Sequence, residues 1–160
     1  MEIASILEPG QTVSSLAAGS KKRAIELASL HITDKNPNLD VGEVYRGLLE
    51  RERLGSTAIG HGVAIPHCRL DHCDKIIGGL FILEEPVDFS APDEGLVSIM
   101  FVLLVPEGET TEHLKALAML AEKFERQSFR DALINAPDSE ALYNAATSDP
   151  TPPDAVSTQP

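Results

Sequence analysis

The stretch SIMFVLLV, residues 98–105, decides the fold, because seven of its eight residues are apolar. A strand with apolar side chains on both faces must be covered on both sides, as in the centre of an α/β sheet. A second strand is predicted at residues 76–83, and a weak strand signal lies at residues 12–16. The sequence therefore predicts a buried sheet built around residues 98–105.

Helical patterns lie on both sides of these strands. Ser20 is a predicted N-cap, and Asp40 followed by Glu43 resembles a capping box. The predicted helices occupy residues 21–31, 41–53 and 111–124, with short helices at 129–134 and 138–146. Because helices come before, between and after the strands, we expect an α/β sandwich in a single domain, residues 1–146. Residues 147–160 are rich in Pro, Ser and Thr and are predicted to be a disordered tail.

The composition narrows the class of protein. The 160 residues suit one domain with a real core, and 42% of them are hydrophobic. A net charge of -12 argues against nucleic-acid or anionic-membrane partners and favours a partner with a basic face. No apolar run is long enough to span a membrane, and no secretory signal is seen. Two cysteines five positions apart form no disulfide framework, so we expect a cytoplasmic protein.

The segment GSTAIGHGVAIPHCRLDHC, residues 55–73, carries the residues best suited to catalysis or ligand binding. Two short apolar runs flank Gly60-His61-Gly62 and predict a hairpin, whose second strand ends at Pro66-His67. A neutral imidazole is a nucleophile, and proline fixes φ, so this strand end is expected to hold His67 stiffly. The two glycines leave backbone amides open to an anion.

Polar and cationic side chains precede His67. Ser56 and Thr57 add hydroxyl donors, and Arg51 and Arg53 add charge at the end of the preceding helix. Guanidinium groups bind phosphate oxygens well. These four residues are therefore predicted to stabilise a phosphate near His67.

His113 is a candidate second component. It lies in the first turn of the helix that Thr110 or Thr111 opens. The positive end of a helix disfavours a charged imidazolium and presents free N–H groups to an anion. Two histidines, an arginine and a helix N-terminus suffice to hold a phosphoryl group on nitrogen, since phosphoryl transfer depends on positioning and charge stabilisation.

Plainer interpretations stand beside this one. A lone histidine after an apolar run is commonly structural, and an arginine pair at a helix end is commonly solvated. The pairs His67-Cys68 and His72-Cys73 suggest metal ligands, but their spacing matches no usual zinc motif. No metal site and no cofactor are therefore predicted. Cys68 beside His67 also suggests a redox-sensitive thiol.

Two motifs resemble a known family. The runs RERLGST (51–57) and IGHGVAIPH (59–67) resemble the core of the type-2 enzyme IIA domains of the bacterial phosphoenolpyruvate-dependent phosphotransferase system, the fructose and mannitol class. LVP (104–106) followed by HLKAL (113–117) resembles that family's second signature. The resemblance runs from about residue 6 to about residue 145, and it is strongest to the nitrogen-regulatory branch.

The resemblance implies a fold and a set of roles. The family fold is a mixed β-sheet flanked by helices. His67 matches the histidine that receives phosphate from an HPr-like phosphocarrier protein, and His113 matches the second active-site histidine. Arg51 matches the arginine of the family's Arg-Glu pair, and Arg53 lies where lysine or arginine is common. Cys68 departs from the pattern, because the family often has glycine or another small residue there.

Two functional hypotheses follow. In the first, the chain is a phosphotransferase component that carries a phosphoryl group on His67, stabilised by Ser56, Thr57 and Arg51. Its regulatory output is then the binding of target proteins such as potassium transporters or sensor kinases, by a monomer. In the alternative, the chain is a regulatory protein-binding module that does not depend on phosphorylation.

Overall fold

Strand β6 (Val97–Pro106) lies in the middle of the sheet, as the apolar stretch predicts. The computed structural model describes residues 1–108 and 110–148. The other strands are β1 (Leu7–Leu16), β2 (Ala58–Gly60), β3 (Val63–Ala64), β4 (His67–Leu70) and β5 (Ile77–Val87). The helices are α1 (Lys21–Asp34), α2 (Val41–Leu54), α3 (Thr111–Phe124), α4 (Gln127–Ile134) and α5 (Ser139–Thr147), after a short 3₁₀ turn at Ile3–Ser5.

The sheet is mixed, with the order β1-β5-β6-β3-β2 and β4 also paired with β6. Strands β5 and β6 are antiparallel, whereas β3 and β4 both run parallel to β6. Both keep the same register on β6, because Val63 lies opposite Ile99 and His67 lies opposite Leu103. Strands β3 and β4 thus pair one after the other with the same edge of β6, with residues 65 and 66 between them.

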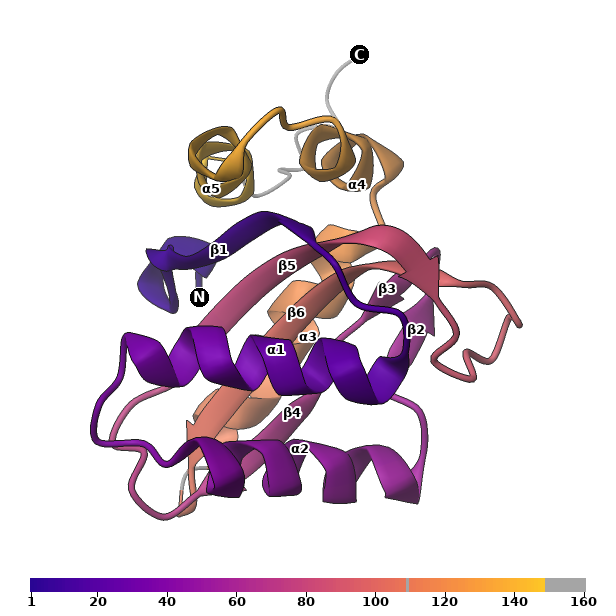
Figure 1. Cartoon of the computed structure of the whole chain (residues 1–160). Helices are drawn as coiled ribbons and strands as arrows, with labels where there is room; N and C mark the ends of the chain where they lie inside the picture. Colours follow the sequence, from indigo (N-terminus) through magenta and orange to yellow (C-terminus); the bar gives the residue numbers. More distant parts are fainter. Residues whose placement is uncertain (109, 149–160) are drawn as a thin grey trace.

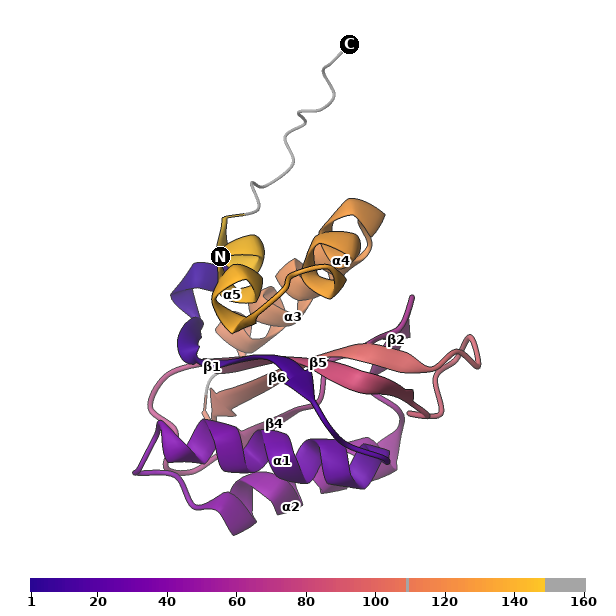
Figure 2. The same cartoon turned by 45° about the horizontal axis from the view of Figure 1, so that its top comes forward.

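Alternate residues of β6 enter two different cores. Met100, Val102 and Leu104 pack in the core that α1 and α2 cover, whereas Phe101 and Leu103 pack in the core of α3, α4 and α5. Figures 1 and 2 show these two layers of helices on opposite faces of the sheet. The α/β fold with a mixed sheet between helices is therefore confirmed.

The starts of α1 and α2 agree with the sequence, the strand predicted at residues 12–16 is confirmed but begins earlier, and the placing of His67 at a strand end was wrong. The side chains of Ser20 and Asp40 accept hydrogen bonds from the backbone N–H groups of Arg23 and Glu43. The first strand begins at Leu7, not residue 12, because an edge strand tolerates the irregular register around Pro9-Gly10. His67 does not end a strand but begins β4.

The C-terminal prediction extends past the part of the chain that the structure describes. Helix α5 runs to Thr147, one residue into the segment predicted as a tail, and residues 149–160 lie outside the described residues. Within residues 1–108 and 110–148, no helix is long and apolar enough to cross a membrane.

Candidate functional site

His67 begins β4, which pairs with β6 but, within the described part of the chain, has no partner strand on its other side that continues β2. Strand β2 pairs with β3, and the Ile65 N–H donates to the Thr57 carbonyl at 3.0 Å. The Ile65 carbonyl lies 2.7 Å from Nδ1 of His67. A carbonyl oxygen only accepts, so Nδ1 of the neutral ring carries the proton. The lone pair of His67 is therefore on Nε2, which is the nucleophilic atom.

His113, from helix α3, lies beside His67. It lies in the first turn of α3, its ring centroid is 5.5 Å from that of His67, and the ring planes meet at 61°. The residue is only 8% exposed. Neither of its ring nitrogens has a hydrogen-bond partner among residues 1–108 and 110–148. A buried polar group without a partner is costly, so His113 is poised to bond an incoming group.

The environment keeps both imidazoles neutral. Burial lowers the pKa of His67, and the charge of Arg51 lowers it further, while the bond to Ile65 acts in the opposite direction. Burial also lowers the pKa of His113, together with the nearby His67 and Arg69. Since both pKa values fall below the ordinary histidine value, neutral pH leaves Nε2 of His67 free to attack.

The two histidines line a cleft of about 740 Å³ between α2, β4 and the start of α3. Its other lining residues are Gly47, Glu50, Arg51, Arg53, Leu54, Cys68 and Arg69. Arg51 and Arg53 come from the last turn of α2, and Nη1 of Arg51 donates to the Gly55 carbonyl at 2.9 Å. The structure therefore brings four of the six predicted site residues together: Arg51, Arg53, His67 and His113.

Ser56 and Thr57 lie outside the set of residues that line the cleft. The Ser56 hydroxyl donates to the Phe89 carbonyl at 2.6 Å and accepts from the Ala58 N–H. The Thr57 hydroxyl donates to Glu52 at 2.6 Å, and the residue is 5% exposed. Both hydroxyls hold the link from α2 to β2 in place. Their predicted role as phosphate ligands stays a prediction.

Sequence reasoning missed two charged residues. Glu52 is buried and accepts from the Thr57 N–H at 3.1 Å and from Nζ of Lys21 at 3.2 Å, so it anchors the arginine-bearing end of α2. Arg69 lines the cleft two residues after His67. The alternation of side chains along a strand would have placed it on the same face as His67, had β4 been expected.

Cys68 borders the cleft and packs in the core between β4 and α2. It is buried, and burial raises the pKa of its thiol to about 12. Because the thiolate is the reactive form, this environment argues against the redox-sensitive thiol suggested by the sequence. Among the described residues, no group of three or more His, Cys, Asp or Glu side chains is arranged to hold a metal ion.

The arrangement can do one kind of chemistry well. A neutral imidazole with a fixed tautomer faces a cleft whose rim carries arginine side chains, and a second neutral imidazole lies 5.5 Å away, centroid to centroid. Arginine binds the charged oxygens of a phosphoryl group, and a buried imidazole donates one further hydrogen bond. The site is suited to a phosphoryl group that is bonded to Nε2 of His67.

Known proteins are similar to this chain in sequence and in fold. The family model described as "Phosphoenolpyruvate-dependent sugar phosphotransferase system, EIIA 2" matches residues 5–148. A nitrogen regulatory protein of Pseudomonas aeruginosa is 44% identical over 138 residues, which are 86% of this chain and 90% of that protein. The nitrogen regulatory protein of Escherichia coli K12 is 36% identical over 155 residues, covering 96% and 94%.

Solved structures agree. The crystal structure of nitrogen regulatory protein IIA-Ntr from Neisseria meningitidis matches with a TM-score of 0.84 and 41% identity, covering 91% of this chain and 99% of that chain. The family resemblance inferred from the two motifs is therefore confirmed. The chain belongs to the EIIA 2 family of the phosphoenolpyruvate-dependent sugar phosphotransferase system, and within it is most like the nitrogen-regulatory branch.

Proposed function

We propose that the chain is a histidine phosphocarrier of the phosphotransferase system with a regulatory output. It accepts a phosphoryl group on Nε2 of His67 from an HPr-like phosphocarrier protein in the cytoplasm. The observation that carries the proposal is the bond from Nδ1 to the Ile65 carbonyl, which leaves Nε2 as the unprotonated nitrogen beside the arginines of the cleft.

The transfer is balanced without a cofactor. The lone pair of Nε2 attacks phosphorus, the P–N bond of the donor phosphohistidine breaks, and the donor nitrogen keeps that electron pair. The proton on Nδ1 stays in its bond to the Ile65 carbonyl, so no base is required. Arg51 and Arg53 compensate the charge on the phosphoryl oxygens, and His113 donates to one of them.

The output follows from charge. A phosphoryl group adds roughly two negative charges at neutral pH, and it does so on the open edge of the sheet. A target protein that touches the cleft rim therefore meets two different surfaces. The names of the relatives support a regulatory reading, and regulatory targets of the kind expected from the sequence, such as potassium transporters or sensor kinases, fit a phosphorylation-dependent surface.

A phosphotransfer assay tests the proposal. The purified chain is mixed with phosphoenolpyruvate, enzyme I and an HPr-like carrier, and its intact mass is followed in time. Wild type should gain one phosphoryl group, His67→Ala should gain none, and His113→Ala and Arg51→Gln should gain it more slowly. His72→Ala is the matched control, because His72 is exposed and outside the cleft.

One outcome favours the alternative. If wild type gains no phosphoryl group while a control acceptor is phosphorylated by the same donor, the site is not a carrier site. The chain is then a protein-binding module, and its partners are sought with His67→Ala, which should keep them.

A further inference from the structure

Thr57 and Ile65 make only half of the backbone pair that their positions allow. Ala58 of β2 lies opposite Ala64 of β3, so the same register brings Thr57 opposite Ile65. In an antiparallel ladder such a pair exchanges two hydrogen bonds, and the first is present, because the Ile65 N–H donates to the Thr57 carbonyl at 3.0 Å. The second would join the Thr57 N–H to the Ile65 carbonyl, but this N–H donates instead to Oε2 of Glu52 at 3.1 Å.

Glu52 is well placed to take this N–H group. It lies in the last turn of α2, five residues before Thr57, and is 6% exposed. Its Oε1 atom accepts from the Thr57 hydroxyl at 2.6 Å, and Oε2 also accepts from Nζ of Lys21 at 3.2 Å. A hydrogen bond to a buried carboxylate is charge-assisted and stronger than a bond to a backbone carbonyl. The Thr57 N–H therefore stays with Glu52.

The Ile65 carbonyl is thereby left to the ring of His67, whose Nδ1 atom lies 2.7 Å from it. A carbonyl oxygen that already accepts a backbone N–H binds a second donor less strongly, so a completed pair with Thr57 would compete with the ring. A weaker bond at Nδ1 would let the proton move to Nε2, the nitrogen that has to stay bare.

We infer that Glu52 is a positioning residue for the phosphoryl acceptor: by binding the Thr57 N–H it reserves the Ile65 carbonyl for Nδ1 and so keeps the lone pair of His67 on Nε2. This inference rests on the proposed function and deepens it, since it names what holds the nucleophile in its reactive tautomer. Glu52 acts through the backbone of β2 and β3, without touching the phosphoryl group.

NMR of the full chain with ¹⁵N-labelled histidine reads the tautomer directly. Spectra are recorded at neutral pH, and the His67 signals are identified by their loss in His67→Ala. In wild type, Nδ1 should carry the proton. In Glu52→Ala the Thr57 N–H can turn to Ile65, so a measurable share of the His67 rings should carry the proton on Nε2. Phosphoryl uptake should then slow about fivefold to tenfold, the effect of losing one hydrogen bond.

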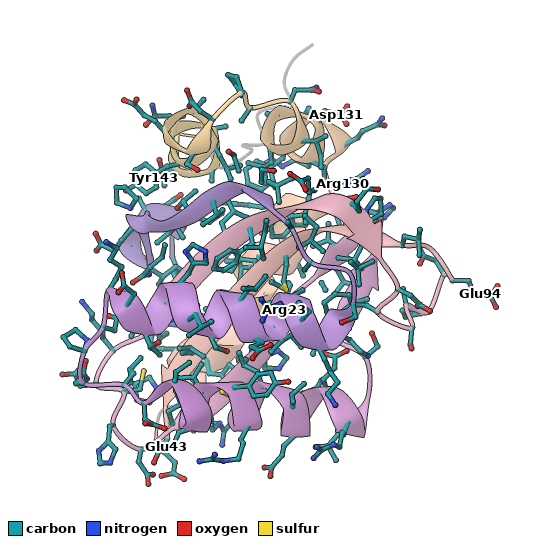
Figure 3. All side chains as sticks on the ribbon, in the orientation of Figure 1. Arg23, Glu43, Glu94, Arg130, Asp131 and Tyr143 are labelled. Carbon is teal, nitrogen blue, oxygen red and sulfur yellow. The ribbon has the colours of Figure 1, made fainter. Side chains whose placement is uncertain are left out.

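Three variants separate this effect from a general loosening of the site. Glu52→Gln keeps an oxygen that accepts the Thr57 N–H, so it should restore the wild-type tautomer and most of the rate. Lys21→Met removes a cation bonded to the same carboxylate but leaves the acceptor in place. Glu26→Ala removes an exposed carboxylate of α1 that pairs with Arg23, labelled in Figure 3. Both of these variants should keep the proton on Nδ1.

The inference alone would be overturned if folded Glu52→Ala kept the proton wholly on Nδ1, or if Lys21→Met changed the tautomer equally. Wild type offers a test that depends on no variant. A hydrogen-bond coupling should join the Thr57 nitrogen to the carboxyl carbon of Glu52, and a coupling to the Ile65 carbonyl carbon would contradict the inference. A wild type that takes up no phosphoryl group would overturn the proposed function, while the tautomer would still decide whether Glu52 places the proton.

Discussion

The contact between Gly47 of α2 and Cys68 of β4 makes a quantitative prediction. A Cβ atom at position 47 would lie 2.9 Å from Sγ of Cys68 and 3.4 Å from its Cβ, so Gly47→Ala forces a shift of about half an ångström to reach ordinary contact at 3.4–4 Å. Overpacking of this kind costs about 1–3 kcal/mol, while alanine gains about 1 kcal/mol over glycine in a helix. The net effect is a loss of up to about 2 kcal/mol.

A double-mutant cycle isolates the contact. In the Cys68→Ala background the sulfur is gone and the remaining 3.4 Å contact is ordinary, so Gly47→Ala should stabilise by about 1 kcal/mol there. The coupling between the two positions is then about 1–3 kcal/mol. Urea unfolding of the four proteins, with equal denaturant slopes, measures it. Equal stabilisation by Gly47→Ala in both backgrounds would refute the argument.

The same cycle reports on function. Helix α2 carries Arg51 and Arg53, so a helix pushed away from β4 moves these cations away from His67. Phosphoryl uptake should therefore slow in Gly47→Ala and recover in the double variant. The Cys68 thiol occupies space that Gly47 leaves open on the facing helix.

Three further predictions concern buried groups. NMR titration should place the titration midpoints of His67 and His113 below pH 6.5. Below about pH 6.5 the unfolded chain then binds more protons than the folded one, so the free energy of unfolding should fall as the pH drops through the lower folded pKa values. A midpoint above 6.5 would contradict this. Glu52→Ala should lower the free energy of unfolding, measured by urea denaturation, by about 2–4 kcal/mol, because it removes the acceptor of two Thr57 donors and of the Lys21 ammonium. A change under about half a kcal/mol would show that water replaces the carboxylate. Alkylation of Cys68 at pH 7.5 should proceed only as fast as the protein opens, and so accelerate with urea, since a pKa of about 12 leaves almost no thiolate; a fast reaction in native buffer would show that the thiol is reachable.

Local signals in the sequence were sufficient for much of the fold. Ser20 and Asp40 cap their helices through bonds to residues three positions later, which a sequence displays directly. The apolar run of β6 is buried on both faces, and a strand of that kind is recognised from composition alone. These elements depend on neighbours in the chain or on burial, so pattern reasoning found them.

Only part of the candidate site could be predicted from the sequence, because the direction of a side chain depends on partners that are distant in the chain. Strand β4 exists through pairing with β6, some 36 positions further along the chain, and Pro66 made the segment look like an ending. With β4 unrecognised, nothing indicated that Arg69 shares a face with His67. The sequence also did not show that the hydroxyls of Ser56 and Thr57 donate to Phe89 and Glu52, because only the fold brings the Phe89 carbonyl near.

The edge of the sheet explains how the nucleophile is prepared. In a parallel pair, alternate residues direct both backbone groups to the same side, and the Pro66 carbonyl accepts from Leu103 of β6, so the Ile65 groups face outward. The Ile65 N–H donates to the Thr57 carbonyl, but the Thr57 N–H donates to Glu52, so the Ile65 carbonyl, at the N-terminal end of β2, needs another donor. The ring of His67 supplies it from two residues away, and this bond places the proton on Nδ1. A β2 that began earlier and paired the Thr57 N–H with this carbonyl would free the ring, so the start of the strand at Ala58 is what keeps Nε2 as the unprotonated nitrogen.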